Sequence, residues 1–231
     1  TLDHYRNAIS HTLVVPGILN SLRFSLFATL LGVAVGLSIS LMTVRWRTPG
    51  WQAFDLLSMM PLAVPGIVMA FGYLSMSIRY EWIRSIMDPV KNPSILLIIA
   101  YGMRRLPYVV RAVTAGLQQT PVELEHAARN LGAGSWLTLR KITVPLVAAN
   151  IVIGALFAFS FSMLEVSDSL ILAQRAEFFP VTRSIFELSQ ILGSGTYIAC
   201  AFGVWAMVFL GTTLVVASLL MGKTIGSLFR F

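Results

Sequence analysis

The chain has 231 residues, of which 56% are hydrophobic and only 12% are charged, and its mean hydropathy is +0.78. A soluble domain carries about 25% charged residues, so this composition excludes an ordinary soluble protein and makes membrane lipid a partner. The formal net charge is +7. No basic patch interleaved with aromatic residues accompanies it, so nucleic acid is not an expected partner.

Five apolar segments are long enough, or nearly so, to cross a bilayer core, which takes about 20 residues of helix. They are continuous and do not alternate apolar with polar residues, which favours helices over the strands of a membrane barrel. We therefore predict an all-α polytopic membrane protein. Its expected spans are 21–44, 54–78, 94–113, 145–164 and 197–221.

The distribution of charge predicts the orientation of these spans. If the polar loop between the third and fourth spans is cytoplasmic, ten Lys and Arg lie on the inside and seven on the outside. The positive-inside rule supports this orientation. Residue 1 is then outside, so we expect an upstream helix to be missing or the chain to be half of a larger polypeptide. The predicted parts are an external segment (1–20), a transmembrane domain (21–222), a cytoplasmic loop (about 116–144) and a cytoplasmic tail (223–231).

Small residues recur every four positions in two of the spans. Gly32 and Gly36 lie in the first, and Gly154, Ala158 and Ser162 lie in the fourth. Such faces let helices approach closely in lipid. They fit contacts within the chain and also contacts with a second membrane subunit.

The second span, 54–78, is interrupted by Pro61, Pro65 and Gly66. Proline removes a backbone donor and clashes with the preceding turn of a helix. Breaks at membrane depth occur where the backbone is buried in protein or lines a cavity, as in transporters with discontinuous helices. The interruption therefore indicates either a kink or part of a substrate path.

Ionisable residues mark two further positions. Arg104 and Arg105 interrupt the third span, where an arginine either snorkels to the cytoplasmic surface or faces a polar interior. Glu165 and Asp168 lie three residues apart at the end of the fourth span. These two carboxylates either attract a cation or are ordinary solvated groups.

The cytoplasmic loop carries the signals of a short helix. Thr120 is a candidate cap, Pro121 fits the first helical position, and Glu123 completes a capping box. The helix is expected to run to Leu131 and to stop at Gly132.

A second short helix is expected to follow the glycine turn. Ser135 is its candidate cap, and Pro145 opens the next span. In the first helix, Ala127 and Ala128 leave room for another protein to approach. A stiff helix joined to a span can transmit force from a docked partner, but a surface helix without a partner has the same pattern.

The loop resembles the EAA loop of binding-protein-dependent ABC importer permeases, whose pattern is Glu-Ala-Ala, three residues, Gly, nine residues, then Ile-x-Leu-Pro. The spacing matches at His126-Ala127-Ala128, at Gly132 and at Ile142 to Pro145. His126 replaces the glutamate, and Val144 replaces the leucine. The neighbouring Glu125 is an acid about 100° away around the helix. The interrupted second span and the Arg-x-Leu-Pro-Tyr at 104–108 are similar to the ferric-iron branch, which has thiamine, polyamine and phosphonate relatives.

The resemblance implies a multi-pass permease subunit of a type I ABC importer in the bacterial inner membrane. Its implied partners are cytoplasmic ATPase subunits, a periplasmic or lipoprotein solute-binding protein, and a second permease domain, either as a homodimer or as a fused half. ATP is then bound by the partner, with no cofactor in this chain, and the substrate is ferric iron or another small solute. Coupling to the ATPases is assigned to Glu123, Glu125, His126, Ala127, Ala128, Gly132, Ile142 and Pro145. The translocation path is assigned to Pro61, Pro65, Gly66, Arg104, Ser162 and Glu165.

Two rival classes are weighed against this interpretation. A secondary transporter or channel driven by an ion gradient needs partnered ionisable residues deep in its spans, and the sequence offers almost none besides Arg104 and Arg105. An enzyme needs a catalytic or metal-binding set, and the three histidines are scattered. The Gly222-Lys223-Thr224 run resembles the end of a P-loop, but Ala217 occupies the position of its first glycine.

Overall fold

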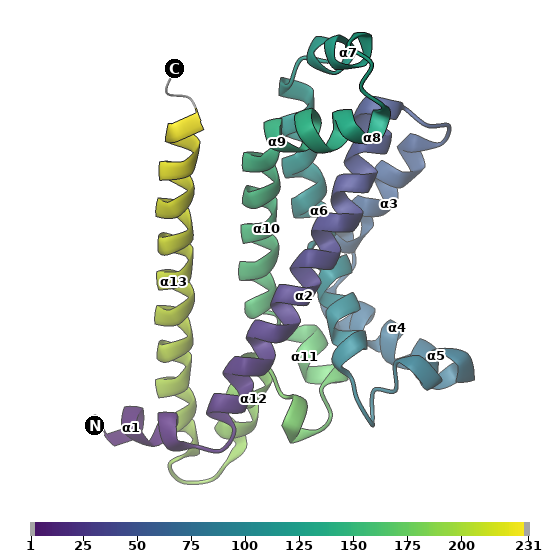
Figure 1. The fold of residues 1–231 in the computed structure, drawn as a ribbon. Helices are drawn as coiled ribbons and strands as arrows, with labels where there is room; N and C mark the ends of the chain where they lie inside the picture. The colour runs from purple at the N-terminus through teal and green to yellow at the C-terminus, as the bar shows by residue number, and fades with distance from the viewer. Residues whose placement is uncertain (1–2, 229–231) are drawn as a thin grey trace.

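The computed structural model describes residues 3–228, which form helices with no strand among them (Figure 1). The longer helices are α2 (Val14–Leu41), α3 (Trp51–Ala63), α4 (Gly66–Arg79), α6 (Ser94–Gln119), α10 (Ala148–Met163) and α13 (Gly195–Leu228). The shorter α-helices are α1 (Asp3–Ser10), α5 (Glu81–Ile86), α7 (Glu123–Asn130), α8 (Ser135–Thr138), α9 (Val144–Leu146), α11 (Ser167–Leu172) and α12 (Val181–Gln190). Two π-helical segments, η1 (Met42–Trp46) and η2 (Leu139–Thr143), and one 3-10 turn, η3 (Ala176–Phe178), complete the described chain.

Within the described chain, two unbroken helices are long and apolar enough to cross a membrane, Val14–Trp46 and Gly195–Val215. Two more spans are counted if each bent pair of helices is one span: α3 with α4, bent by 108°, and Ser135–Leu146 with α10, bent by 69°. The predicted count of five spans is therefore not confirmed. The fifth candidate, α6, has 26 residues, which is long enough, but three arginines reduce its apolar character.

The centre of the bundle is formed by α2, α6 and α10, which lie side by side (Figure 1). The predicted small-residue faces meet α6 within the chain. A Cβ built on Gly36 would lie 2.8 Å from Val109 Cγ1, and one built on Gly154 would lie 3.0 Å from Val109 Cα. These glycines allow three helices to pack closely without an aqueous gap.

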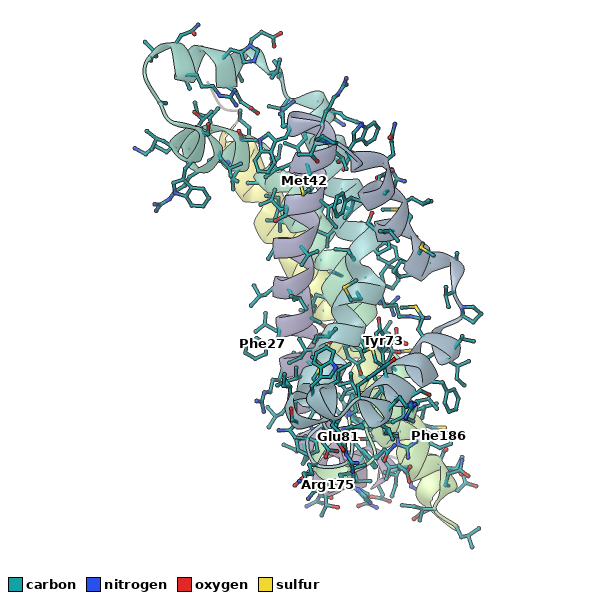
Figure 2. The ribbon with its side chains drawn as sticks, turned by 90° about the vertical axis from the view of Figure 1, so that its right-hand side faces the viewer. Phe27, Met42, Tyr73, Glu81, Arg175 and Phe186 are labelled. Atoms are coloured by element: carbon teal, nitrogen blue, oxygen red, sulfur yellow. The ribbon has the colours of Figure 1, made fainter. Side chains whose placement is uncertain are left out.

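Short helices lie at both ends of the bundle. The helices α7 and α8 project at one end, and α1 and α12 lie at the other, where α13 begins (Figure 1). Glu81 and Arg175 lie at the end with α1, whereas Phe27, midway along α2, points away from the bundle (Figure 2). Polar ends around an apolar middle are what a membrane domain requires.

The predicted boundaries shift at both termini. The first long helix starts at Val14, inside the predicted external segment 1–20. The predicted tail 223–231 overlaps α13, which continues to Leu228, and 229–231 lie outside the described residues. The helix α1 and the end of α13 lie at opposite ends of the bundle (Figure 1).

Candidate functional site

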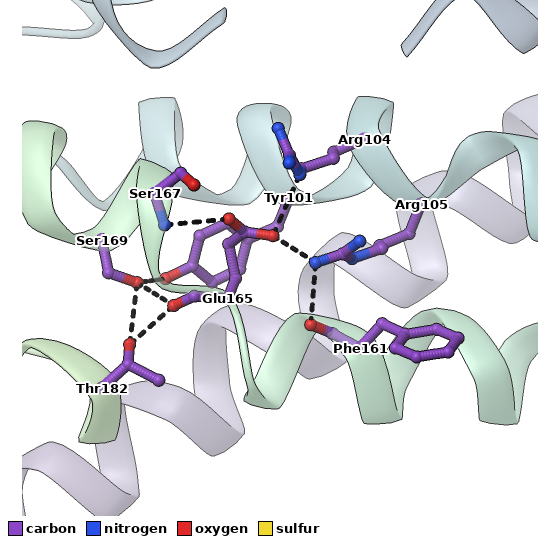
Figure 3. Close-up of polar contacts among 8 residues, drawn as sticks. All are labelled: Tyr101, Arg104, Arg105, Phe161, Glu165, Ser167, Ser169 and Thr182. Carbon is purple, nitrogen blue, oxygen red and sulfur yellow. Dashed lines mark hydrogen bonds and ion pairs between the residues drawn. The ribbon is translucent and has the colours of Figure 1, made fainter. Parts of the chain in front are cut away.

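A cluster of charged side chains, largely shielded from solvent, lies where α6 passes the end of α10. Arg104 and Arg105 project from α6, and Glu165 from the turn after α10 (Figure 3). Glu165 Oε2 is 3.1 Å from Arg104 Nε and also pairs with Arg105 Nη2. The Glu165 side chain is only 3% exposed. A single carboxylate oxygen therefore neutralises two neighbouring guanidinium groups.

Hydrogen bonds fix the backbone that carries Glu165. Its Oε1 accepts from the Ser167 backbone N–H at 3.1 Å, and its carbonyl oxygen accepts from Ser169 Oγ at 2.5 Å and Thr182 Oγ1 at 2.6 Å. Tyr101, fully buried on α6, shares a hydrogen bond with Ser169 at 2.5 Å (Figure 3). The turn is thereby held against α6 and α12.

Several buried polar atoms near this cluster lack a hydrogen-bond partner among the described residues. They are Arg104 Nε and Nη1, Arg105 Nε, Ser162 Oγ, and both carboxylate oxygens of Asp168. Arg104 Nε is close to Glu165, but the contact is an ion pair without hydrogen-bond geometry. Buried polar groups are normally satisfied, so such a concentration marks a place where a ligand or water supplies the missing contacts.

The broken helix α3–α4 reaches the same place. Gly66 is the first residue of α4, and a Cβ built on it would overlap the guanidinium group of Arg104. Of the predicted path residues, Gly66, Arg104 and Glu165 are therefore brought together, with Pro65 adjoining them as the N-cap of α4. Pro61 lies inside α3, before the break.

The structure decides one alternative that the sequence left open and adds two residues. Arg104 and Arg105 face a polar interior, where they form one ion-pair cluster with Glu165. The prediction of almost no partnered ionisable residues in the spans excepted these two arginines, and the cluster is formed by them. Ser169 and Thr182 join the cluster without any sequence signal, since ordinary hydroxyl residues carry no motif.

The second candidate site is the loop around α7, at the end of the bundle opposite α1 and α12 (Figure 1). Thr120 ends α6 as its C-cap, and its hydroxyl bonds the carbonyl of Gly116 at 2.9 Å. The N-cap of α7 is Val122, with no side-chain hydrogen bond. The predicted capping box of Thr120 and Glu123 is therefore wrong, because the preceding helix already uses the threonine.

The glycine turn after α7 agrees with the prediction. Gly132 has a φ of +87°. Its N–H donates to Arg129 O at 2.9 Å, and the N–H of Ala133 donates to Ala128 O at 3.0 Å. This pair of bonds is a Schellman motif, which favours glycine at the left-handed position. The second predicted cap is wrong, since Ser135 is the first residue of α8 and Gly134 precedes it as N-cap.

Glu125 faces the membrane domain and not the outward surface of the loop. Its Oε1 accepts from Arg45 Nε at 2.8 Å, and both side chains are less than 10% exposed. Arg45 Nη2 also donates to the carbonyl oxygen of Thr120 at 2.9 Å. One arginine thus ties the end of α2 and η1 to the last turn of α6 and to α7.

The outward surface of the loop is formed by other residues. Glu123, His126 and Ala127 are exposed, whereas Ala128 is buried. Two large apolar side chains, Leu131 at 89% and Trp136 at 73%, are among the most exposed in the described chain. Ile142 lies in η2 and Pro145 in α9, both ahead of a 69° bend, so the next long helix opens after the bend at Ala148 and not at Pro145.

Residues 28–219 match the family described as binding-protein-dependent transport system inner membrane component, and the chain belongs to that family. It is similar to the molybdenum transport system permease protein ModB of Escherichia coli K12, with 32% identity over 156 residues, 64% of this chain and 67% of the relative. It is also similar to the sulfate transport system permease protein CysT of the same strain, with 26% identity over 173 residues, which are 73% of this chain and 62% of the relative. A putative ferric transport system permease protein FbpB 1 of Haemophilus influenzae shares 30% identity over 157 residues, which are 68% of this chain and 24% of the relative.

Solved structures show the same fold. A bacterial alginate ABC transporter, in complex with a periplasmic protein that holds an alginate pentasaccharide, superposes with a TM-score of 0.74 and 18% identity, covering 93% of this chain and 80% of that one. An amino acid ABC transporter with histidines superposes with a TM-score of 0.67 and 20% identity, covering 91% of this chain and 94% of that one. The chain is therefore an ABC importer permease subunit of the inner membrane. This membership disfavours the gradient-driven alternative.

Proposed function

We propose that this permease forms the translocation path of an ATP-driven importer, and that separate ATPase subunits drive it through the loop around α7. The observation that carries the proposal is the exposure of Leu131 and Trp136, which flank the glycine turn between the projecting helices α7 and α8. Exposed apolar patches rimmed by polar residues mark protein interaction sites. ATP is bound by those partner subunits, and this chain contributes no cofactor.

The proposal includes two further partners. A solute-binding protein docks at the end that holds α1 and α12, and a second permease domain, a further copy or a fused half, completes the path. A related fold in complex with a periplasmic protein supports the first of these. Moving the path from 1:99 to 99:1 between two states takes about 5.5 kcal/mol of differential binding. The Arg45–Glu125 ion pair supports transmission of that energy, because it joins the loop to α2 and α6.

A small inorganic oxyanion is the substrate class best supported. Arg104 and Arg105 offer guanidinium donors in the middle of the bundle, and such donors match the oxygens of an oxyanion. Relatives named for molybdenum and sulfate transport agree with this choice. Ferric iron is the second candidate. The carboxylates of Glu165 and Asp168 and the similarity to a ferric transport permease favour it.

The test is uptake by the complete complex in proteoliposomes, with ATP enclosed and the solute-binding protein outside. We expect ATP-dependent accumulation of labelled molybdate or sulfate. Accumulation of labelled ferric iron in their place would support the second candidate.

The coupling role is tested in the same vesicles with Ala127→Glu. A charge on the docking surface should lower uptake by about 100-fold or more, equivalent to ~2.7 kcal/mol, with membrane insertion unchanged. The matched control is Ala176→Glu, the same substitution at an exposed alanine near the other end. Because that end is where the solute-binding protein is proposed to dock, the comparison is made on co-purification of the ATPase subunits, which Ala127→Glu should weaken and Ala176→Glu should leave unchanged. Undiminished uptake in Ala127→Glu would reject the coupling role.

A further inference from the structure

Three sources of positive potential converge in the middle of the bundle. The guanidinium groups of Arg104 and Arg105 lie on consecutive residues of α6. The Arg104 guanidinium contacts Gly66, the first residue of α4. A helix begins with exposed N–H groups and the positive end of its dipole, which repel a nearby cation and attract an anion. Such an arrangement is stable only with an anion close by.

The anion at this place is the carboxylate of Glu165. A single oxygen, Oε2, meets both arginines, and the side chain is nearly inaccessible to solvent. The pairing leaves part of the binding capacity unused, since Arg104 Nε, Arg104 Nη1 and Arg105 Nε donate to no described group. A carboxylate has two oxygens, and Oε1 is engaged by Ser167. The guanidinium groups can therefore satisfy a ligand richer in oxygens than Glu165.

We infer that Arg104 and Arg105 form an exchangeable oxyanion site within the membrane domain, in which Glu165 is the resident counter-ion that an incoming oxyanion displaces. This inference rests on the proposed import function and adds the residues that meet the substrate there. The exchange keeps a negative charge on the arginines throughout. That matters because a buried guanidinium left without a counter-ion is strongly destabilising.

The local structure allows the side chain of Glu165 to move while its backbone stays in place. Its carbonyl oxygen is held by Ser169 and Thr182, which anchor the turn between α10 and α11. Only the Ser167 N–H and the two arginines hold the carboxylate. Rotation of one side chain thus frees the site without unfolding the turn.

Asp168 limits what the site accepts. It is fully buried, and neither of its oxygens accepts a hydrogen bond from a described residue. A second negative group near the arginines weakens their hold on any anion, which suits a path that must release its substrate. Gly66 is a positioning residue, since any larger side chain would displace the Arg104 guanidinium.

The experiment uses Glu165→Gln in the purified permease–ATPase complex without solute-binding protein. The probes are sulfate and molybdate, with chloride at matched ionic strength as the reference. Removing the resident carboxylate should let the oxyanions bind about 10-fold more tightly or better, seen as a rise in thermal stability and as bound radiolabelled sulfate. The matched control is Glu177→Gln, which removes a glutamate from an exposed ion pair with Arg175. It should respond like the wild type.

Two further variants settle the location and guard against misfolding. Adding Arg104→Gln to Glu165→Gln should abolish the gained binding, and persistence of that binding would place the anion elsewhere and overturn the inference. If Glu165→Gln does not assemble, Glu165→Asp shortens the reach to the arginines and should still show stronger stabilisation by sulfate than the wild type does. Stabilisation no greater than that of Glu177→Gln in every Glu165 variant that assembles also overturns the inference. Uptake by the wild-type complex is measured separately, so a failed import function and a failed exchange site are told apart.

Discussion

Among the described residues, the buried carboxylates Glu125 and Glu165 pair with arginines, and they differ in how completely those arginines are used. At the loop around α7, Arg45 donates to Glu125 and to the carbonyl of Thr120. In the middle of the bundle, Arg104 and Arg105 share Glu165 and retain unused donors.

The difference separates a structural link from a binding site. A satisfied ion pair holds elements in one arrangement, whereas an incompletely satisfied one retains affinity for an additional group. The loop is therefore fixed to the membrane domain, and the central cluster is left able to take a ligand.

The largest effect is expected from Glu125→Ala, which leaves Arg45 buried without its carboxylate. Removing one partner of a buried pair costs about 3–5 kcal/mol, so α7 should lose its fixed position against α2 and α6. The number of substrate ions imported per ATP hydrolysed, measured in proteoliposomes, should fall steeply. The charge swap Arg45→Glu with Glu125→Arg should recover part of it. An unchanged ratio in Glu125→Ala would show that the pair is not a link.

The next effect concerns the central cluster. Gly66→Ala places a methyl group against the Arg104 guanidinium, which is the movable end of a long side chain and must swing away from Glu165. The cost should therefore lie at the low end of the about 1–3 kcal/mol typical of overpacking. Uptake should fall, and thermal stability should drop by a corresponding amount. Gly72→Ala in the same helix is the control, because no atom lies within 4 Å of a Cβ there. Equal behaviour of the two variants would argue against a close contact between α4 and Arg104.

A smaller effect is expected at the turn of the loop. Gly132→Ala forces alanine into a left-handed conformation, which costs about 1–2 kcal/mol, while Gly134→Ala at an ordinary φ should be nearly neutral. Both positions are open, so sterics do not distinguish them. Protease sensitivity of the loop, followed alongside uptake, measures the difference. A larger loss in Gly134→Ala would contradict the Schellman assignment.

The smallest effect is expected at the exposed pair of Arg175 and Glu177. Both side chains are 52% exposed, and exposed ion pairs contribute about 0–1 kcal/mol. Glu177→Gln should leave thermal stability within error of the wild type, which makes it a baseline for the stability of Glu125→Ala. A loss comparable to that of Glu125→Ala would remove the distinction between buried and exposed pairs.

How far the sequence predicts each region follows from the spacing of the contacts. The glycine turn depends on residues within five positions of one another, and it was predicted correctly. The capping box failed although it is equally local, because Thr120 bonds backward to Gly116 in α6 and is no longer free to cap α7.

The central cluster was predicted only in part. Glu165 meets arginines 60 and 61 residues earlier, and only the packing of α6 beside α10 brings them together. Arg104 and Glu165 could be named singly, but their pairing could not be predicted. The same arginines explain the uncertain span count, since they lower the apolar character of α6 although it lies at the centre of the bundle.

The most direct test of the account compares two very exposed leucines at opposite ends of the bundle. A photocrosslinking residue replaces Leu131 in the loop or Leu192 near the start of α13, where the exposed fractions are 89% and 97%. During ATP turnover by the assembled complex, position 131 should crosslink to the ATPase subunit and position 192 should not. If position 131 stays free of the ATPase while the complex imports its substrate, the loop is not the coupling element.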